Sequence, residues 1–231
     1  MMKMGKVLDD IPLQLNIDKI IKELRLTRKE GASTNARKLM EEAESLIRAR
    51  AVYRVSYIDK KGKDTVEISG ITFSSRVLRV NLEKVERVFP YIITIGNALE
   101  DKASKSDDLL KQFYLEAIGD MALYSSMQHL EKHLKSQYGL DKLANMNPGS
   151  LKDWPITEQK LLFSLFQDME GQIGVKLTEN MLMIPRKSIS GIYFPTEVNF
   201  FSCQLCPRER CQAREAPYDK SLREKYRLDD E

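Results

Sequence analysis

Three cysteines lie within nine positions near the end of the sequence, and they are all the cysteine in the chain. Cys203 and Cys206 have the two-residue spacing that lets one turn direct two thiolates at a single metal, and Cys211 follows closely. An odd number of clustered cysteines favours a metal or redox site over a disulfide scaffold. The sequence therefore predicts a metal-binding unit of Cys203, Cys206 and Cys211, with three ordinary thiols as the alternative.

The identity of such a metal stays open. Zinc needs a fourth ligand, and the only histidines, His129 and His133, are four residues apart on one side of a predicted helix. Histidines in this arrangement more often lie on a polar helix face. An iron-sulfur cluster with a fourth ligand other than cysteine is the competing use of the thiolates. Three arginines would offset the negative charge of a thiolate centre: Arg208, Arg210 and Arg214.

Other catalytic motifs are missing from the sequence. There is no glycine-rich phosphate loop before a helix, no nucleophile elbow, and no histidine close to a cysteine in sequence. The carboxylates of residues 41–44 have the pattern of a solvated helix face. Hydrolase chemistry therefore has no support.

The overall composition is that of a globular protein. The 231 residues are 42% hydrophobic and 31% charged, and 37 basic against 34 acidic residues give a net charge of +3. This surplus is too small to predict a nucleic-acid partner. The sequence has no run of 18 apolar residues, and its first residues lack the features of a secretory signal. We therefore expect a cytoplasmic protein without a membrane span.

Hydrophobic periodicity predicts the elements that must position these residues. Helices are expected at 16–26, 33–51, 106–137 and 157–169, and strands at 52–59, 65–69, 77–80, 85–95, 181–184, 188–194 and 198–202. Pro90 favours an edge position for its strand, and Gly119 inside the long helix favours close packing against another element.

Strands separated by whole helices, without regular alternation, indicate an α+β fold. We expect an N-terminal helical segment at 1–51, an α+β body at 52–202 and a cysteine-containing tail at 203–231. Few aliphatic residues follow Cys211, so the end of the tail is expected to be irregular, either wrapped over the body or mobile.

Four motifs follow one another along the chain: Pro148-Gly149, residues 173–179 (IGVKLTE), residues 183–185 (MIP) and residues 188–194 (SISGIYF). In this order they resemble the activation domain of cobalamin-dependent methionine synthase. The resemblance extends over residues 52–202. It implies a twisted antiparallel sheet flanked by helices, in agreement with the periodicity.

The resemblance also implies a site for S-adenosylmethionine. The matching positions are Asn145, Pro148, Gly149, Ser150, Ser188, Ser190, Gly191 and Tyr193. In the family the loop reads Arg-x-x-Pro-Gly-Tyr, and its arginine and tyrosine hold the ligand. Here Asn145 and Ser150 take these two places, so the charge that would hold a carboxylate is lost unless Lys152 or Arg186 replaces it.

Three functions follow as hypotheses. In the first, a stand-alone accessory protein docks on a corrinoid protein of a methyltransferase system, which supplies the corrinoid, and assists its reductive reactivation or methylation. In the second, the cysteines hold an iron-sulfur cluster or zinc and the chain is a redox protein. In the third, the chain is an interaction module that has kept the fold and lost the ligand.

Overall fold

The computed structural model describes residues 5–16, 32–211 and 214–228. The helix expected at 16–26 falls almost entirely outside these residues. Within them, no helix is long and apolar enough to cross a membrane.

The described strands form one antiparallel sheet of eight strands and a small separate hairpin. The sheet contains β1 (Lys6–Leu8), β2 (Arg50–Tyr53), β3 (Ser56–Lys61), β4 (Thr65–Ile68), β5 (Ile71–Ser74), β6 (Arg87–Thr94), β7 (Leu143–Met146) and β10 (Ser188–Pro195). The hairpin consists of β8 (Lys176–Leu177) and β9 (Met183–Ile184). The expected α+β fold is confirmed.

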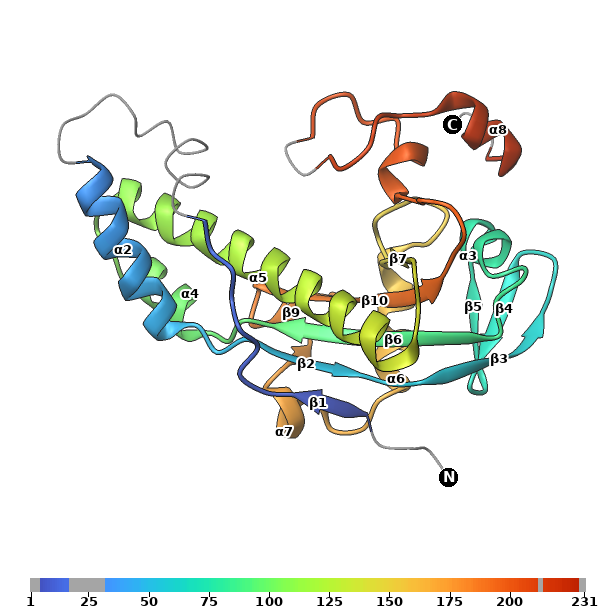
Figure 1. Cartoon of the computed structure of the whole chain (residues 1–231), viewed down its shortest axis with the longest axis horizontal. Helices are drawn as coiled ribbons and strands as arrows, with labels where there is room; N and C mark the ends of the chain where they lie inside the picture. Colours follow the sequence, from blue (N-terminus) through green and yellow to red (C-terminus); the bar gives the residue numbers. More distant parts are fainter. Residues whose placement is uncertain (1–4, 17–31, 212–213, 229–231) are drawn as a thin grey trace.

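The helices are arranged around this sheet (Figure 1). They are α2 (Ala32–Leu46), α3 (Arg76–Asn81), α4 (Ala98–Ser104), α5 (Leu109–Tyr138), α6 (Gln159–Ser164), α7 (Met169–Ile173) and α8 (Lys220–Lys225). Two short 3-10 helices are Ile156–Glu158 and Ser202–Leu205.

Strand β6 is central and not an edge strand. It pairs with β2 and β3 along one side and with β10 along the other. Pro90 has no N–H group to donate to a neighbouring strand. Its carbonyl accepts a hydrogen bond from Arg54 N (3.0 Å), at the gap between β2 and β3. Because the N–H and C=O of one residue point to the same side of a strand, the missing N–H faces this gap and no strand pairing is lost.

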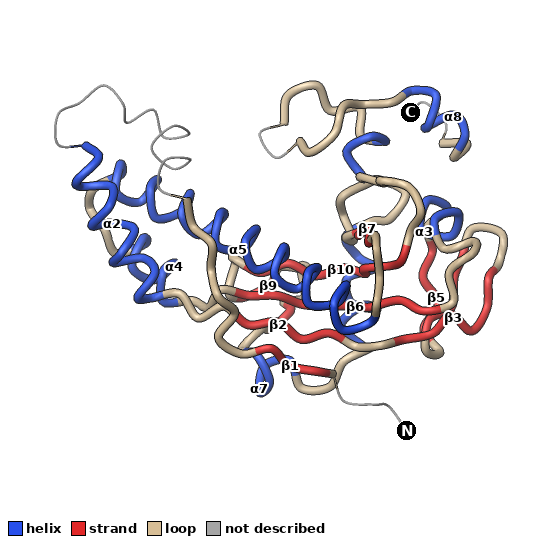
Figure 2. Tube along the Cα trace, viewed as in Figure 1, coloured by secondary structure: helices blue, strands red, loops and turns tan. Residues whose placement is uncertain are grey.

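Each face of the sheet covers its own core. Phe89, Tyr91 and Ile93 of β6 point to the face covered by α2, α4 and the long α5. Val88 and Ile92 point to the opposite core, which includes Trp154 and side chains of α6 and α7. Figure 2 shows that α5 runs obliquely over the sheet.

The long helix α5 confirms the strongest helical pattern in the sequence. Its N-cap is Asp108, whose side chain accepts hydrogen bonds from Leu110 N and Lys111 N, and it ends at Gly139 in the left-handed conformation. Gly119 lies where a Cβ would be 3.3 Å from Leu99 of α4 and 3.4 Å from Lys187. The expected close packing is confirmed.

Two expected strands are wrong. Residues 77–80 belong to helix α3, because Ser75 Oγ accepts a hydrogen bond from Leu78 N and Asp153 accepts from the backbone of Arg76 and Val77. Residues 198–202 leave the sheet after Pro195: Thr196 bonds locally to Val198, and the side chain of Val198 is 65% exposed. Neither apolar run contains a signal that separates strand from helix or loop.

The predicted helix at 157–169 is shorter and interrupted. It starts with a 3-10 turn, α6 ends at Ser164, and a new helix, α7, starts after Asp168. Asp168 has a φ of 44° and caps α7 by accepting a hydrogen bond from Gly171 N. The helix expected at 33–51 likewise ends at Leu46, and residues 50–51 already belong to β2.

Candidate functional site

The adjacent strands β7, β10 and β6 bring together the polar side chains of a candidate site. Tyr193 of β10 lies opposite Asn145 of β7, and Gly191 lies opposite Tyr91 of β6. Asn147, which follows β7, reaches the same place. We call Tyr91, Asn145, Asn147 and Tyr193 the tyrosine-asparagine cluster; it lies on the face that α5 covers.

Hydrogen bonds and ring stacking fix the cluster. The rings of Tyr91 and Tyr193 stack with centroids 4.6 Å apart. Asn147 Nδ2 donates to Tyr91 Oη (2.9 Å) and to the carbonyl of Ser190 (2.8 Å). Asn145 lies opposite Tyr193 in the β7–β10 pairing, and the hydroxyl of Tyr193 donates to the carbonyl of Met127 in α5 (3.3 Å). These side chains are therefore held in one arrangement.

The cluster strongly favours neutral tyrosines. Burial raises the pKa of Tyr91 and of Tyr193, and repulsion from Glu215 adds to the rise at both. The pKa of Glu215 is itself raised by desolvation and by Glu131. Both tyrosines thus act as neutral hydrogen-bonding groups near neutral pH, beside two carboxylates that come from α5 and the tail.

The predicted loop residues, 148–150, lie next to this cluster, and their contacts stabilise the loop. Pro148 is buried. Gly149 has a φ of 84°, and a Cβ there would be 2.9 Å from Ile156, so glycine is required for packing. Ser150 Oγ donates to the carbonyl of Asn147 (2.7 Å). Gly149 and Ser150 also line a cavity of about 880 Å³, together with residues 205–208 of the tail.

The predicted serines of β10 support the backbone. Ser188 Oγ lies 2.9 Å from Thr94 Oγ1 and 2.7 Å from the carbonyl of Pro185, at the opposite end of β10 from the cluster. Ser190 contributes its carbonyl to Asn147. Of the eight predicted cofactor positions, Asn145, Ser190, Gly191 and Tyr193 come together, Pro148, Gly149 and Ser150 form the adjoining loop, and Ser188 lies apart.

The structure does not bring the cysteines into a metal centre. Cys203 and Cys206 are half-buried, Cys211 is exposed, and all three are free thiols. Among residues 5–16, 32–211 and 214–228, no three His, Cys, Asp or Glu side chains are grouped to hold a metal. Arg214 bonds the carbonyls of Cys203 (3.1 Å) and Cys206 (3.3 Å), so it ties the loop together through its backbone.

The histidines have another role. His133 Nε2 lies 3.0 Å from the hydroxyl of Tyr53, and the two rings meet edge to face. Burial lowers the pKa of His133, and His129 and Lys6 lower it further. His133 therefore acts as a neutral packing partner of the sheet, and it does not lie on a solvated polar helix face.

Sequence reasoning missed Tyr91, Asn147, Glu131 and Glu215. Asn147 had a usable signal, because a residue two positions after Asn145 lies on the same face of an extended chain. Tyr91 sits in a strand that reads as wholly apolar, and Glu131 and Glu215 approach only through tertiary packing.

The chain is an α+β protein whose fold is similar to that of a solved reactivation domain. The crystal structure of the MetH reactivation domain bound to AdoHcy superposes with a TM-score of 0.58 at 16% identity, over 85% of this chain and 80% of that one. This likeness shows the fold.

A family model matches part of the chain. The sequence model of the activation domain of vitamin B12 dependent methionine synthase matches residues 147–216, which contain the Pro-Gly loop, β10 and the cysteines. The resemblance to that domain is confirmed over this segment. A comparison with curated proteins gave no match.

The loop fits S-adenosylmethionine poorly. Asn145 lies opposite Tyr193 in the β7–β10 pairing, and the hydroxyl of Ser150 is bonded within its own loop, so neither presents a cation or an aromatic ring to a ligand. Arg186 cannot take over, because its guanidinium is paired with Glu100 and Glu116. Lys152 does line the cavity beside Ser150.

Proposed function

We propose that this chain is an accessory protein that docks on a cytoplasmic corrinoid protein and assists its reductive reactivation or methylation. The family match over residues 147–216 is the observation that carries the proposal. The fold shared with a reactivation domain supports it.

The role we propose is placement. A reactivating domain has to hold a donor against the corrinoid, which turns a bimolecular encounter into a positioned one. Tyr91 and Tyr193 are buried, so the tyrosine-asparagine cluster supports this role indirectly, by holding β6, β7 and β10 in a fixed arrangement beside the loop 148–150. The partner protein supplies the corrinoid.

We also propose that S-adenosylmethionine binds weakly if it is the donor. Losing a hydrogen bond to a charged group typically removes about 1.5–3 kcal/mol of binding free energy. The replacement of the family's arginine by Asn145 is such a loss.

Binding to the corrinoid protein in different cobalt states tests the accessory role. We expect a direct complex with the cobalt(II) form that is tighter than the complex with the methylated form, measured by calorimetry under anaerobic conditions. A reactivator that binds both states equally cannot shift the partner's equilibrium. Equal affinities, or no complex in either state, would rule out the proposed function.

A further inference from the structure

Cys203 and Cys206 lie at the two ends of one closed turn. The turn includes the 3-10 helix Ser202–Leu205, and Cys206 N donates to the carbonyl of Cys203 (3.3 Å). A turn closed by such a bond keeps its end Cα atoms within about 7 Å, and side chains three residues apart in a 3-10 helix lie over one another. Disulfides join cysteines whose Cα atoms are about 4.4–6.8 Å apart. The backbone therefore brings these two thiols into the range of a disulfide bond.

Contacts with the rest of the chain hold this turn in place. The side chain of Leu205, inside the turn, is fully buried. Arg214 donates from Nη1 to the carbonyl of Cys203 (3.1 Å) and from Nη2 to the carbonyl of Cys206 (3.3 Å), so one guanidinium joins both ends of the turn. Two thiols held at a fixed separation react with each other far more readily than two thiols in a flexible chain.

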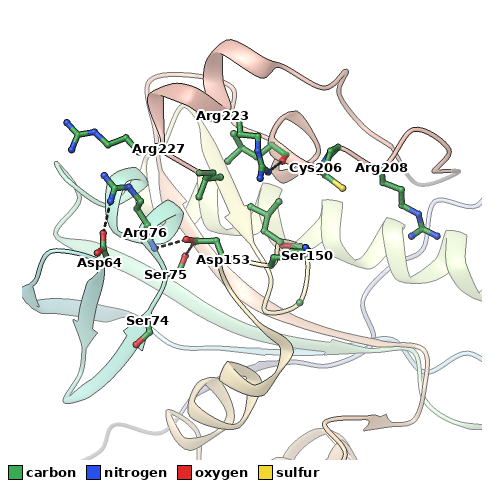
Figure 3. Close-up of a pocket in the computed structure, with 16 residues that line it drawn as sticks. Asp64, Ser74, Ser75, Arg76, Ser150, Asp153, Cys206, Arg208, Arg223 and Arg227 are labelled. Carbon is green, nitrogen blue, oxygen red and sulfur yellow. Dashed lines mark hydrogen bonds and ion pairs between the residues drawn. The ribbon is translucent and has the colours of Figure 1, made fainter. Parts of the chain in front are cut away.

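A small reagent can reach the pair. Both cysteines are half-buried free thiols, and Cys206 lines the cavity of about 880 Å³ (Figure 3). This cavity gives a small molecule a path to the sulfur of Cys206. Cys211 is exposed and lies in a different turn, in which its carbonyl accepts a hydrogen bond from Arg214 N (3.3 Å). The turn therefore pairs Cys203 with Cys206 and leaves Cys211 as a separate thiol.

We propose that Cys203 and Cys206 form a reversible disulfide by exchange with a small disulfide of the glutathione type. The Cys206 thiolate attacks the small disulfide, forms a mixed disulfide and releases one glutathione thiolate. The Cys203 thiolate then attacks the sulfur of Cys206, closes the protein disulfide and releases the second glutathione thiolate. The protein loses two protons and two electrons, and the small disulfide becomes two thiols. This redox site needs neither a metal nor a corrinoid partner.

The same turn anchors the last part of the tail. The carbonyl of Gln204 accepts a hydrogen bond from Asp219 N (2.8 Å), and the carbonyl of Leu205 accepts one from Arg223 Nη1 (3.2 Å). Both acceptors lie between the two cysteines, so a disulfide fixes the backbone that holds the tail. Backbone amides of residues 217–228 should therefore exchange hydrogen more slowly in the oxidised protein.

Glutathione redox buffers test the pairing. The protein is prepared anaerobically, treated with a chelator, equilibrated with mixtures of reduced and oxidised glutathione, alkylated and analysed by peptide mass spectrometry. A disulfide within the protein releases two glutathione molecules, so its oxidised fraction depends on the square of the reduced-glutathione concentration. A mixed disulfide releases one glutathione molecule and depends on the first power. We expect the second-power dependence for the peptide that contains Cys203 and Cys206.

Four variants separate the roles of these residues, and thermal unfolding is used to confirm that each one folds. Cys203→Ser should accumulate glutathione on Cys206, because the thiol that closes the disulfide is absent. Cys211→Ser should form the disulfide as the wild type does. Arg214→Gln should lower the equilibrium constant for disulfide formation roughly threefold or more, because the turn is held less firmly. Arg210→Gln removes an exposed charge of the same loop and should leave this constant unchanged.

Several results would overturn the proposal. They are a Cys203–Cys206 pair that stays reduced or carries only glutathione, a disulfide that uses Cys211, and equal amounts of bound glutathione in the wild type and Cys203→Ser. Equal shifts in Arg214→Gln and Arg210→Gln would also overturn it, as would the same tail exchange in the oxidised and reduced wild type.

Discussion

Gly191 shows how a single missing side chain makes room for the site. A Cβ at this position would be 2.5 Å from Asn147 Nδ2, 2.6 Å from the carbonyl of Met146 and 2.9 Å from Tyr91 Oη. The Met146 carbonyl is backbone in a paired strand and cannot move without disturbing β7. Glycine is therefore required where β10 passes between Tyr91 and Asn147.

We predict that Gly191→Ala lowers the free energy of unfolding by about 1–3 kcal/mol, because the added methyl group overpacks the cluster. Urea denaturation measures the change. Gly119→Ala is the matched comparison: its Cβ meets ends of the flexible Leu99 and Lys187 side chains, and alanine favours helix by about 1 kcal/mol. Equal losses in the two variants would contradict the clash at Gly191.

Asn145 and Ser150 stand where the activation domain that this chain resembles has an arginine and a tyrosine. We predict that calorimetry will show S-adenosylmethionine binding to the wild type more weakly than submicromolar. Asn145→Arg with Ser150→Tyr should tighten it roughly tenfold or more, because a charge-assisted hydrogen bond to the ligand's carboxylate is restored.

The Ser150→Tyr variant alone serves as the control, since it changes the loop without adding charge. A submicromolar dissociation constant for the wild type would contradict the prediction. So would an arginine variant that folds normally and binds no better than the control.

At the scale of elements, an ion-pair network joins α4, α5 and the segment before β10. Glu116 of α5 pairs with Arg186 (3.0 Å) and Lys187 (2.9 Å), and Arg186 also bonds Glu100 of α4. Burial raises the pKa of Glu116, but the hydrogen bonds and charges of Lys187 and Arg186 outweigh it and hold the pKa below 4.5. The network positions the start of β10.

We predict that Glu116→Gln lowers stability by about 1 kcal/mol near neutral pH, since Glu116 is partly exposed and solvent screens its pairs. A lowered pKa in the folded state means that the stabilisation is complete above pH 4.5 and is lost as the pH falls through the folded-state pKa. Urea midpoints measured across acidic pH should therefore converge for wild type and variant.

Glu41→Gln in α2 is the control, because Glu41 is exposed and should show no such pH-dependent difference. A stability difference between wild type and Glu116→Gln that stays constant down to the lowest pH would show that the charge of Glu116 is not what stabilises the network.

At the scale of the whole molecule, the packing of the tail decides what the cysteines can do. The tail wraps against α3 through Tyr226, which is 7% exposed and whose ring lies 6.0 Å from that of Phe200. Its last helix, α8, is visible beside α3 in Figure 1. Arg214 holds the cysteine loop by bonding the carbonyls of Cys203, Cys206 and Ala216.

We predict that an alkylating reagent labels exposed Cys211 before the half-buried Cys203 and Cys206, in protein prepared anaerobically. Arg214→Gln should loosen the cysteine loop, so that the labelling rates of the three cysteines become more similar. Arg210→Gln should leave these rates unchanged. Mass spectrometry of the labelled peptides measures the order. If all three thiols are equally protected from labelling, and a chelator removes this protection, the cysteines form the metal-binding unit expected from the sequence.

Elements with a long apolar pattern or a strong cap could be predicted from the amino-acid sequence. Helix α5 follows from its apolar period and from Asp108, and β6 and β10 follow from their apolar runs. The Pro-Gly loop and the motif around Gly191 pointed to the activation domain whose sequence model matches residues 147–216, and to half of the polar cluster. Local propensity and a specific motif are both properties of short segments, so they can be read without the fold.

The remaining features arise from contacts between segments that are far apart in the chain. Asp153 lies far along the chain from residues 77–80, yet its capping of α3 makes them helical. Pro90 sits in a central strand because the partner strand breaks opposite it. Tyr91 and Asn147 meet across Gly191, while the cysteines do not converge on a metal. These outcomes depend on strand register and on packing between distant segments, which periodicity along one segment does not encode.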